Sequence, residues 1–504
     1  MSLIRSSLLV GLGSIASRIL GFVRDMLFAQ ALGAGPVADA FLTAFRLPNL
    51  MRRIVGEGGL NPALVPQLSR LDAKDAAATA GDVLSLFALA LLALTALVEM
   101  GAGFVALLLA PGLRDDGGTL ALTAFYTRLS FPIVFAVTLS SVAAAILNMR
   151  GRFGATALAP LAVNVGLILT LVILETVVVV PLDAKAAWLS GASSIAGFVQ
   201  LLAVMIALRQ GGERLVIFRK PRWSPALKSL LLAGFPALVA SGAVQLFVLA
   251  GTIVASFWPS AISWLYYADR VMQLPLGLMA ALGSSVLLPE LARHHHAGET
   301  KAIIGSQHRA LEMALLLALP ASAALLILSF PITRVLFERG AFLASDTQGT
   351  ALVLAALSLG LPFATAGKVL SQTLFARGAL RMTLAGTALG ILVTLVSGLL
   401  LAPLWGVSGI ALGISLGSAA HAFAMAWLLN RIGLWRPDRL FLGRLIRIAA
   451  AAALMSLGLW AAQGFLAPDD SLTLTAFCLG GLGLYALAAW LTRAVTRDDL
   501  AVFR

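Results

Sequence analysis

The sequence predicts an all-α polytopic membrane protein. Of its 504 residues, 60% are hydrophobic and only 12% are charged, and the mean hydropathy is +0.96. A soluble domain carries about 25% charged residues. Apolar windows of about 20 residues, the length that spans the hydrocarbon core as a helix, recur along the whole chain. We count fourteen, over residues 5–31, 37–58, 83–110, 120–147, 155–180, 187–208, 228–256, 262–288, 308–330, 350–375, 382–402, 406–429, 445–466 and 473–492.

The first apolar window resembles a secretory signal, because Arg5 precedes a run of apolar residues. The run continues well past a plausible cleavage point and carries charges, so we expect this helix to be retained. The single cysteine, Cys478, excludes an intrachain disulfide and forms no metal site by itself. No metal and no cofactor is expected.

The net charge of +13 reflects topology rather than nucleic-acid binding. If both termini are cytoplasmic, 24 of the 36 Lys and Arg residues fall in cytoplasmic segments and four in the opposite loops. Such a bias is the positive-inside rule, and it orients the chain with both ends in the cytoplasm. We expect no nucleic-acid partner.

Short motifs recur at a fixed distance and indicate an internal repeat. Leu47-Pro48 is echoed by Leu274-Pro275 and Arg150-Gly151 by Arg377-Gly378, both 227 residues apart, and "SFPIVF" (130–135) resembles "GLPFAT" (360–365). We therefore expect two pseudo-symmetric six-helix lobes with a site between them near mid-membrane, as in transporters. The expected parts are an N-lobe over 1–210, a basic linker over 211–227, a C-lobe over 228–430, and helices 13 and 14 with the tail over 431–504.

Eight basic residues remain inside the predicted spans. Each would cost about 3 kcal/mol at the centre of a spanning helix, so such groups persist only in a wet cavity or in pairs. They are Arg18, Arg24, Arg46, Arg52, Arg53, Arg128, Arg270 and Lys368. The acids in the spans are chiefly Asp25, Asp39, Glu57, Glu99, Asp269 and Glu312.

One reading of these charges is structural pairing. It would join Arg18 to Asp25, Arg46 to Asp39, and Arg270 to Asp269. The cations outnumber the acids, however, and arginine binds phosphate oxygens through two parallel donors. We therefore expect a central hydrated cationic cavity that binds a phosphorylated anion. Arg53, Arg128 and Glu99 lie nearer helix ends, where snorkelling to the membrane surface is the better explanation for them.

Two long motifs carry a family resemblance. "SRILGFVRDMLFAQALGAGPVADAFLTAFRLPNLMRRIVGEGGLNPALVPQL" (17–68) and "YYADRVMQLPLGLMAALGSSVLLPEL" (266–291) resemble the MurJ (MviN) family, the lipid II flippases of bacterial cell-wall synthesis. The resemblance covers the whole chain. It implies the fold of the multidrug/oligosaccharidyl-lipid/polysaccharide exporter superfamily, with two lobes in a V and helices 13 and 14 forming a groove for a lipid tail.

The resemblance also implies a set of site residues. Substrate-binding arginines fall on Arg18, Arg24, Arg52 and Arg270. Supporting residues are Asp25, Asp39, Arg46, Arg53, Asp269, Gln273 and Lys368. Gln273 stands where some members carry an acid, and the predicted helix over 228–256 contains no acid, so the chain departs from members described with a sodium site.

The implied function is a flippase rather than an enzyme. It would carry lipid II, an undecaprenyl-diphosphate-linked disaccharide-pentapeptide, from the inner to the outer leaflet of the bacterial cytoplasmic (inner) membrane by alternating access. We expect a monomer surrounded by membrane lipids, with the cell-wall synthesis machinery as a partner.

Three alternatives stay open at this point. An exporter of another polyprenyl-linked glycan or of a drug would share the superfamily, although drug exporters usually bind cations and would favour acids. A membrane enzyme acting on polyprenyl phosphates would need clustered carboxylates or histidines, whereas the outward loops hold scattered acids and the histidines at 294–296 suit a solvated loop. A scaffold gives no reason to bury eight cations.

Overall fold

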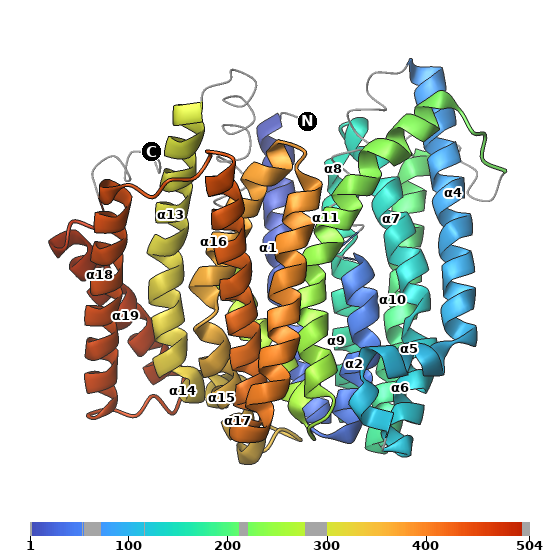
Figure 1. The fold of residues 1–504 in the computed structure, drawn as a ribbon. Helices are drawn as coiled ribbons and strands as arrows, with labels where there is room; N and C mark the ends of the chain where they lie inside the picture. Colours follow the sequence, from blue (N-terminus) through green and yellow to red (C-terminus); the bar gives the residue numbers. More distant parts are fainter. Residues whose placement is uncertain are drawn as a thin grey trace. The chain divides into compact units, whose positions relative to one another are not determined.

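The computed structural model describes residues 3–52, 54, 72–114, 116–210, 220–277 and 300–495. Every regular element within these ranges is a helix (Figure 1). The chain divides into two compact units, Met1–Leu246 and Phe247–Arg504, and each is described here by itself. The all-α, multi-pass fold class is confirmed.

Long helices with short connections build both units. The first unit contains α1 (Leu3–Leu32), α2 (Pro36–Arg52), α4 (Ala73–Met100), α5 (Ala102–Leu109), η2 (Pro111–Arg114), α6 (Gly117–Ser130), α7 (Pro132–Met149), α8 (Phe153–Leu158), α9 (Leu161–Thr176), α10 (Leu182–Gln210) and most of α11 (Pro225–Ala255). The second contains the end of α11, a helix over 261–277, α13 (Thr300–Ile327), α14 (Ser329–Phe337), α15 (Ala344–Ser358), α16 (Leu361–Ala376), α17 (Leu380–Arg431), α18 (Arg439–Gln463) and α19 (Ser471–Leu491).

The helices match the predicted apolar windows. Among the described residues, eight helices are long and apolar enough to cross a membrane, and the bent pair of α15 and α16 would make a ninth span. Each of the fourteen windows overlaps a helix of the structure. The count of fourteen spans stays a prediction.

The repeat is visible in two turns that share one geometry. After α7, the amide of Gly151 donates to the carbonyl of Asn148 and that of Arg152 to Leu147. After α16, Gly378 donates to Phe375 and Ala379 to Leu374 in the same pattern. Both glycines are left-handed, with φ of 70° and 68°, which forms the Schellman end of a helix. The arginine-glycine echo therefore marks equivalent helix ends.

The proline echo also marks equivalent positions. Pro132 opens α7 directly after α6, and Pro362 lies in the first turn of α16 directly after α15. Proline lacks the amide hydrogen that a helix interior needs but is tolerated in the first turn. At the second of these positions the helix bends by 45°.

The 52 residues of α17 form a hairpin of two helices. Gly406 interrupts the helix with φ of 58° and ψ of −138°, a conformation that favours glycine. The halves then pack closely through small residues: a Cβ added to Gly413 would lie 2.6 Å from the amide nitrogen of Gly398. The halves correspond to the windows predicted over 382–402 and 406–429.

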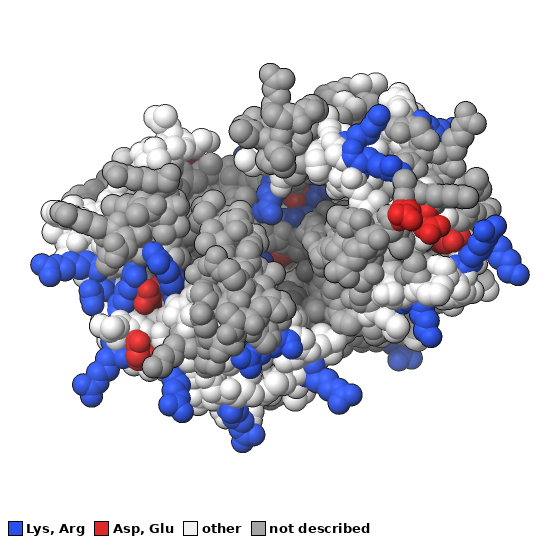
Figure 2. Space-filling view, turned by 90° about the horizontal axis from the view of Figure 1, so that it is seen from above, with Lys and Arg blue, Asp and Glu red and all other residues white. Residues whose placement is uncertain are grey.

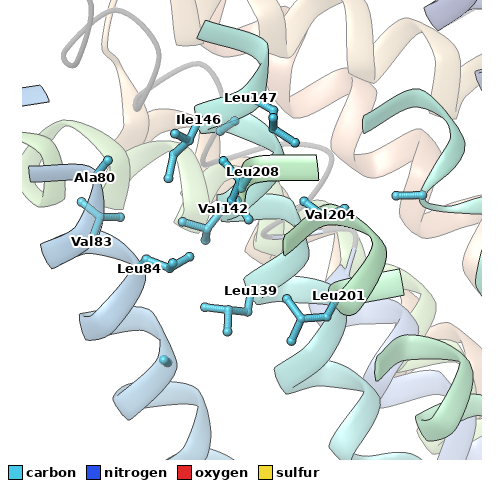
Figure 3. Close-up of a cluster of buried hydrophobic side chains, with 14 of the residues drawn as sticks. Ala80, Val83, Leu84, Leu139, Val142, Ile146, Leu147, Leu201, Val204 and Leu208 are labelled. Atoms are coloured by element: carbon cyan, nitrogen blue, oxygen red, sulfur yellow. The ribbon is translucent and has the colours of Figure 1, made fainter. Parts of the chain in front are cut away.

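A hydrophobic core holds the first unit together where α4, α7 and α10 meet (Figure 3). Its side chains are at most 8% exposed. They include Val83 and Leu84 of α4, Leu139, Val142 and Ile146 of α7, and Leu201, Val204 and Leu208 of α10. Burying each such side chain contributes about 1.5–3 kcal/mol in water; in lipid, close packing supplies more of the stabilisation.

The two helices outside the repeat pack within the second unit. Residues of α18 and α19, among them Ile448, Met455 and Phe477, form a core cluster that contacts α13. The Tyr485 hydroxyl of α19 donates to the Leu316 carbonyl of α13 at 2.6 Å. This bond satisfies a polar group that would otherwise face hydrocarbon.

Candidate anion-binding site

Arg24 is buried in the first unit, with only 6% of its surface exposed. Its Nε and Nη2 atoms donate to one carboxylate oxygen of Asp25, at 3.0 and 2.8 Å. Its Nη1 donates to Oδ1 of Asn164 at 2.9 Å, across from α1 to α9. The guanidinium is thus fixed from two helices, by a charged partner and by a neutral one.

Aromatic rings complete the surroundings of Arg24. Its Cζ lies 5.4 Å from the ring centroid of Phe28 and 5.5 Å from that of Phe45. The two rings also contact Phe41, at centroid distances of 5.1 and 5.6 Å. A cation over desolvated rings is stabilised by the ring quadrupole, so α1 and α2 provide a platform for this charge.

The other predicted residues of the first unit are placed differently. Arg18 is exposed, whereas Asp39 and Arg46 of α2 are buried, with 3% and 8% of their surfaces exposed. The structural-pairing interpretation predicted that Arg18 pairs with Asp25. In the structure, Arg24 forms the ion pair with that carboxylate. Seven residues separate Arg18 from Asp25, a rise of about 10 Å along a helix, and Arg24 is adjacent. The side chain of Arg52 and all of Arg53 lie outside the described residues.

Four side chains of the helix over 261–277 form a network in the second unit. Arg270 Nη2 donates to the Tyr266 hydroxyl at 3.0 Å, and Nη1 donates to Oε1 of Gln273 at 3.2 Å. Gln273 Nε2 donates in turn to Oδ2 of Asp269 at 2.5 Å. The Tyr266 ring centroid lies 5.1 Å from Arg270 Cζ. As at Arg24, an aromatic ring and an amide hold the guanidinium.

This network corrects the predicted pairing of Arg270 with Asp269. Gln273 follows Asp269 by four positions and Arg270 by three, so it lies on the same helix face as both. Its amide donates to the carboxylate and accepts from the guanidinium. Lys368 of α16 is exposed and is not among the members of this network.

Asn164 and Tyr266, which belong to these arrangements, had no role assigned from the sequence, and Glu312 had no partner assigned. Asn164 is the one strongly polar residue in the apolar stretch "LAVNVGLILTLVIL" of α9, and that isolation was the available signal. Tyr266 precedes Arg270 by about one helical turn within the motif over 266–291, and that spacing was the available signal. Glu312 pairs with Arg444 of α18 at 2.8 Å, outside both arginine networks.

The described residues contain no group of His, Cys, Asp and Glu side chains arranged to hold a metal ion. The three histidines at 294–296 lie outside the described residues. Both networks are built around a guanidinium held by several partners, a group that binds anions through charge-assisted hydrogen bonds.

The family of the chain follows from its sequence. A model of the family described as "Lipid II flippase MurJ" matches residues 28–474. This chain belongs to the MurJ family.

Relatives in this family match along nearly the whole chain. A "Probable lipid II flippase MurJ" of Rhizobium meliloti (strain 1021) is 37% identical over 97% of this chain and 93% of its own length. The "Lipid II flippase MurJ" of Burkholderia cenocepacia is 31% identical, with 95% of each chain covered. The family and the apolar helices make this chain a multi-pass inner-membrane protein.

Solved structures share the fold. One described as "Lipid II flippase MurJ, inward closed conformation" superposes with a TM-score of 0.79 at 23% identity, over 96% of this chain and 99% of that one. An inward-facing multidrug resistance transporter of the MATE family superposes with a TM-score of 0.68 at 15% identity, over 82% and 94%. Both structures thus share the overall fold of this chain.

Proposed function

We propose that this chain is a lipid II flippase that carries its substrate from the inner to the outer leaflet of the cytoplasmic membrane by alternating access. The observation that carries the proposal is membership of the MurJ family along residues 28–474. Lipid II as the substrate follows from the names of the relatives, which are 31–37% identical to this chain over most of its length. No bond is made or broken, so the protein is not an enzyme.

The substrate's diphosphate would be bound by Arg18, Arg24, Arg52 and Arg270. Arg24 supports this role because three of its five N–H groups are bonded to Asp25 and Asn164 within the described residues, which leaves two for an anion. Planar, permanently charged donors suit phosphate oxygens. Asp25 and Asp269 act by orienting arginines, together with Asp39, Arg46, Arg53, Gln273 and Lys368 as supporting residues.

The proposal includes an orientation with both termini in the cytoplasm. Figure 2 shows, among the described residues, many more Lys and Arg than Asp and Glu side chains on the face seen from above in Figure 1. Such an excess suits the cytoplasmic side. The lobes over 1–210 and 228–430 would alternate in access as a monomer, and the cell-wall synthesis machinery would supply and consume the lipid.

A second candidate is an exporter of another polyprenyl-linked glycan or of a drug. The fold is shared with multidrug transporters, and this is the observation that favours it. The arginine-rich networks count against a cationic drug, because like charges repel.

Outer-leaflet lipid II in a bacterium depleted of its own flippase tests the proposal. Expression of this chain should restore lipid II to the outer leaflet, measured by a probe that does not cross the membrane, whereas Arg270→Ala should not. Restored growth without lipid II in the outer leaflet, or no restoration by a correctly inserted wild-type chain, would favour the second candidate.

A further inference from the structure

We propose that two neutral amides, Gln273 and Asn164, are positioning residues that fix the orientation of Arg270 and Arg24 for the substrate's diphosphate. The inference rests on the proposed function, in which these arginines bind the diphosphate. It assigns a role to Asn164 and defines that of Gln273.

Gln273 uses both ends of its amide. Oε1 accepts from Arg270 at 3.2 Å, and Nε2 donates to Asp269 at 2.5 Å. Asp269 has no other hydrogen bond or ion pair among the described residues. The amide therefore lies between the carboxylate and the guanidinium and bonds to both, so it limits the orientations open to Arg270.

Asn164 also uses both ends of its amide, here between two helices. Its Oδ1 accepts from Arg24 at 2.9 Å, and its Nδ2 donates to the Ser17 carbonyl at 3.1 Å. Ser17 lies about two turns before Arg24 in α1. The amide lies over Gly21, where an added Cβ would be 3.8 Å from it. Only 8% of Asn164 is exposed. A buried amide bonded at both ends holds one orientation, and it holds Arg24 in the same way.

In this chain, an amide can make both bonds at each of these positions, because it donates and accepts. A carboxylate accepts hydrogen bonds but cannot donate, so at 273 an ionised carboxylate would lose the bond to Asp269 and repel it. An apolar side chain would leave an arginine N–H group without that acceptor, which is costly away from water. The amide therefore holds the guanidinium in one orientation.

Other buried amides provide matched controls. In the first unit, Gln200 of α10 donates to the Ser140 hydroxyl of α7 at 3.3 Å. In the second, Gln307 of α13 donates to the Thr373 hydroxyl of α16 at 3.0 Å. Both join helices as Asn164 does, but neither bonds to an arginine in the described part of the chain.

Lipid binding by the purified full chain in detergent tests the inference. The probes are undecaprenyl diphosphate and undecaprenol, which differ only in the diphosphate. Gln273→Ala and Asn164→Ala should each weaken binding of the diphosphate about tenfold, the size expected for one bond to a charged group, and leave undecaprenol unchanged. Gln200→Ala and Gln307→Ala should bind both probes as the wild type does.

A double variant and a carboxylate variant separate positioning from general structural loss. Arg270→Ala combined with Gln273→Ala should bind no worse than Arg270→Ala alone, because the amide acts through the arginine. Gln273→Glu should bind undecaprenyl diphosphate more weakly than the wild type at neutral pH, since an ionised carboxylate cannot donate to Asp269.

The outcomes distinguish the inference from the function it rests on. If the wild type binds both probes equally, diphosphate recognition itself is wrong. If the wild type prefers the diphosphate but both alanine variants bind it normally, or the control variants lose as much as they do, the positioning role is wrong. Should Asn164→Ala fail to fold, the Gln273 variants decide the question alone.

Discussion

Glu312 of α13 and Arg444 of α18 form an ion pair in which Oε2 and Nη1 lie 2.8 Å apart. Both side chains are largely buried, with 14% and 16% exposed. Nε of Arg444 also donates to the carbonyl of Ala494, just beyond α19, at 3.2 Å. One arginine therefore joins the two helices outside the repeat to a helix inside it.

Glu312→Gln should destabilise the protein, because it leaves the Arg444 charge without its counter-charge. Removing one partner of a fully buried pair costs about 3–5 kcal/mol; partial exposure reduces this to about 1–3 kcal/mol. Thermal unfolding of the purified protein in detergent measures the loss. Glu175→Gln is the control, since Glu175 pairs with Lys185 at 2.6 Å in a more exposed position and should cost below about 1 kcal/mol. Equal losses would contradict the interpretation.

Gly413→Ala should destabilise the α17 hairpin. The added methyl would lie 2.6 Å from the nitrogen and 2.7 Å from the Cα of Gly398, and backbone cannot move aside as a flexible side chain can. Gly480→Ala in α19, where nothing lies within 4 Å, should be neutral or stabilising because alanine is the better helix former. The midpoints of thermal unfolding should differ in these opposite directions, and a tolerated Gly413→Ala would mean that the two halves pack less closely than described.

Arg270→Ala should abolish support of growth in a depleted strain while the protein is still inserted. Arg270→Lys should restore function in part, because lysine keeps the charge but loses the planar fork that bonds both Tyr266 and Gln273. Arg128→Ala should support growth fully, since Arg128 is exposed and donates to the carbonyl of Glu99. Normal growth with Arg270→Ala would remove this residue from the site.

Collapse of the membrane potential should stop outward flipping, whereas removal of sodium should have little effect. A diphosphate carries about two negative charges, and each gains about 2.3 kcal/mol per 100 mV on moving outward across an inside-negative membrane. For two charges the bias toward the outer leaflet is about 4–5 kcal/mol per 100 mV. If transport is fully coupled to the potential, this shifts the distribution of lipid II between the leaflets more than a thousandfold. Outer-leaflet lipid II is measured after an ionophore at constant sodium and after sodium removal at constant potential; the reverse pattern would show that a sodium site exists despite the acid-free α11.

The helices and the repeat were predictable from local sequence. Apolar windows mark helices because their length is set by the membrane, and glycine after arginine marks a helix end because Gly151 and Gly378 must be left-handed. Breaks within an apolar window were harder to predict. In the window over 83–110, α4 ends at Met100 and the short helix α5 begins at Ala102.

The partners of the charged residues were much less predictable. Asn164 and Arg24 are 140 positions apart, and Glu312 and Arg444 are 132 apart. Helical spacing relates side chains on one helix only, so it cannot choose a partner on another. Even within one helix, the spacing that placed Gln273 near Asp269 did not show that the amide lies between the acid and Arg270.

The α17 hairpin has a mechanical consequence. Its halves approach backbone to backbone at several glycines, among them Gly398 and Gly413. We expect the two halves to move together as one rigid unit. Motion in the second unit should then concentrate at the 45° bend between α15 and α16, where a first-turn proline has already removed a backbone bond.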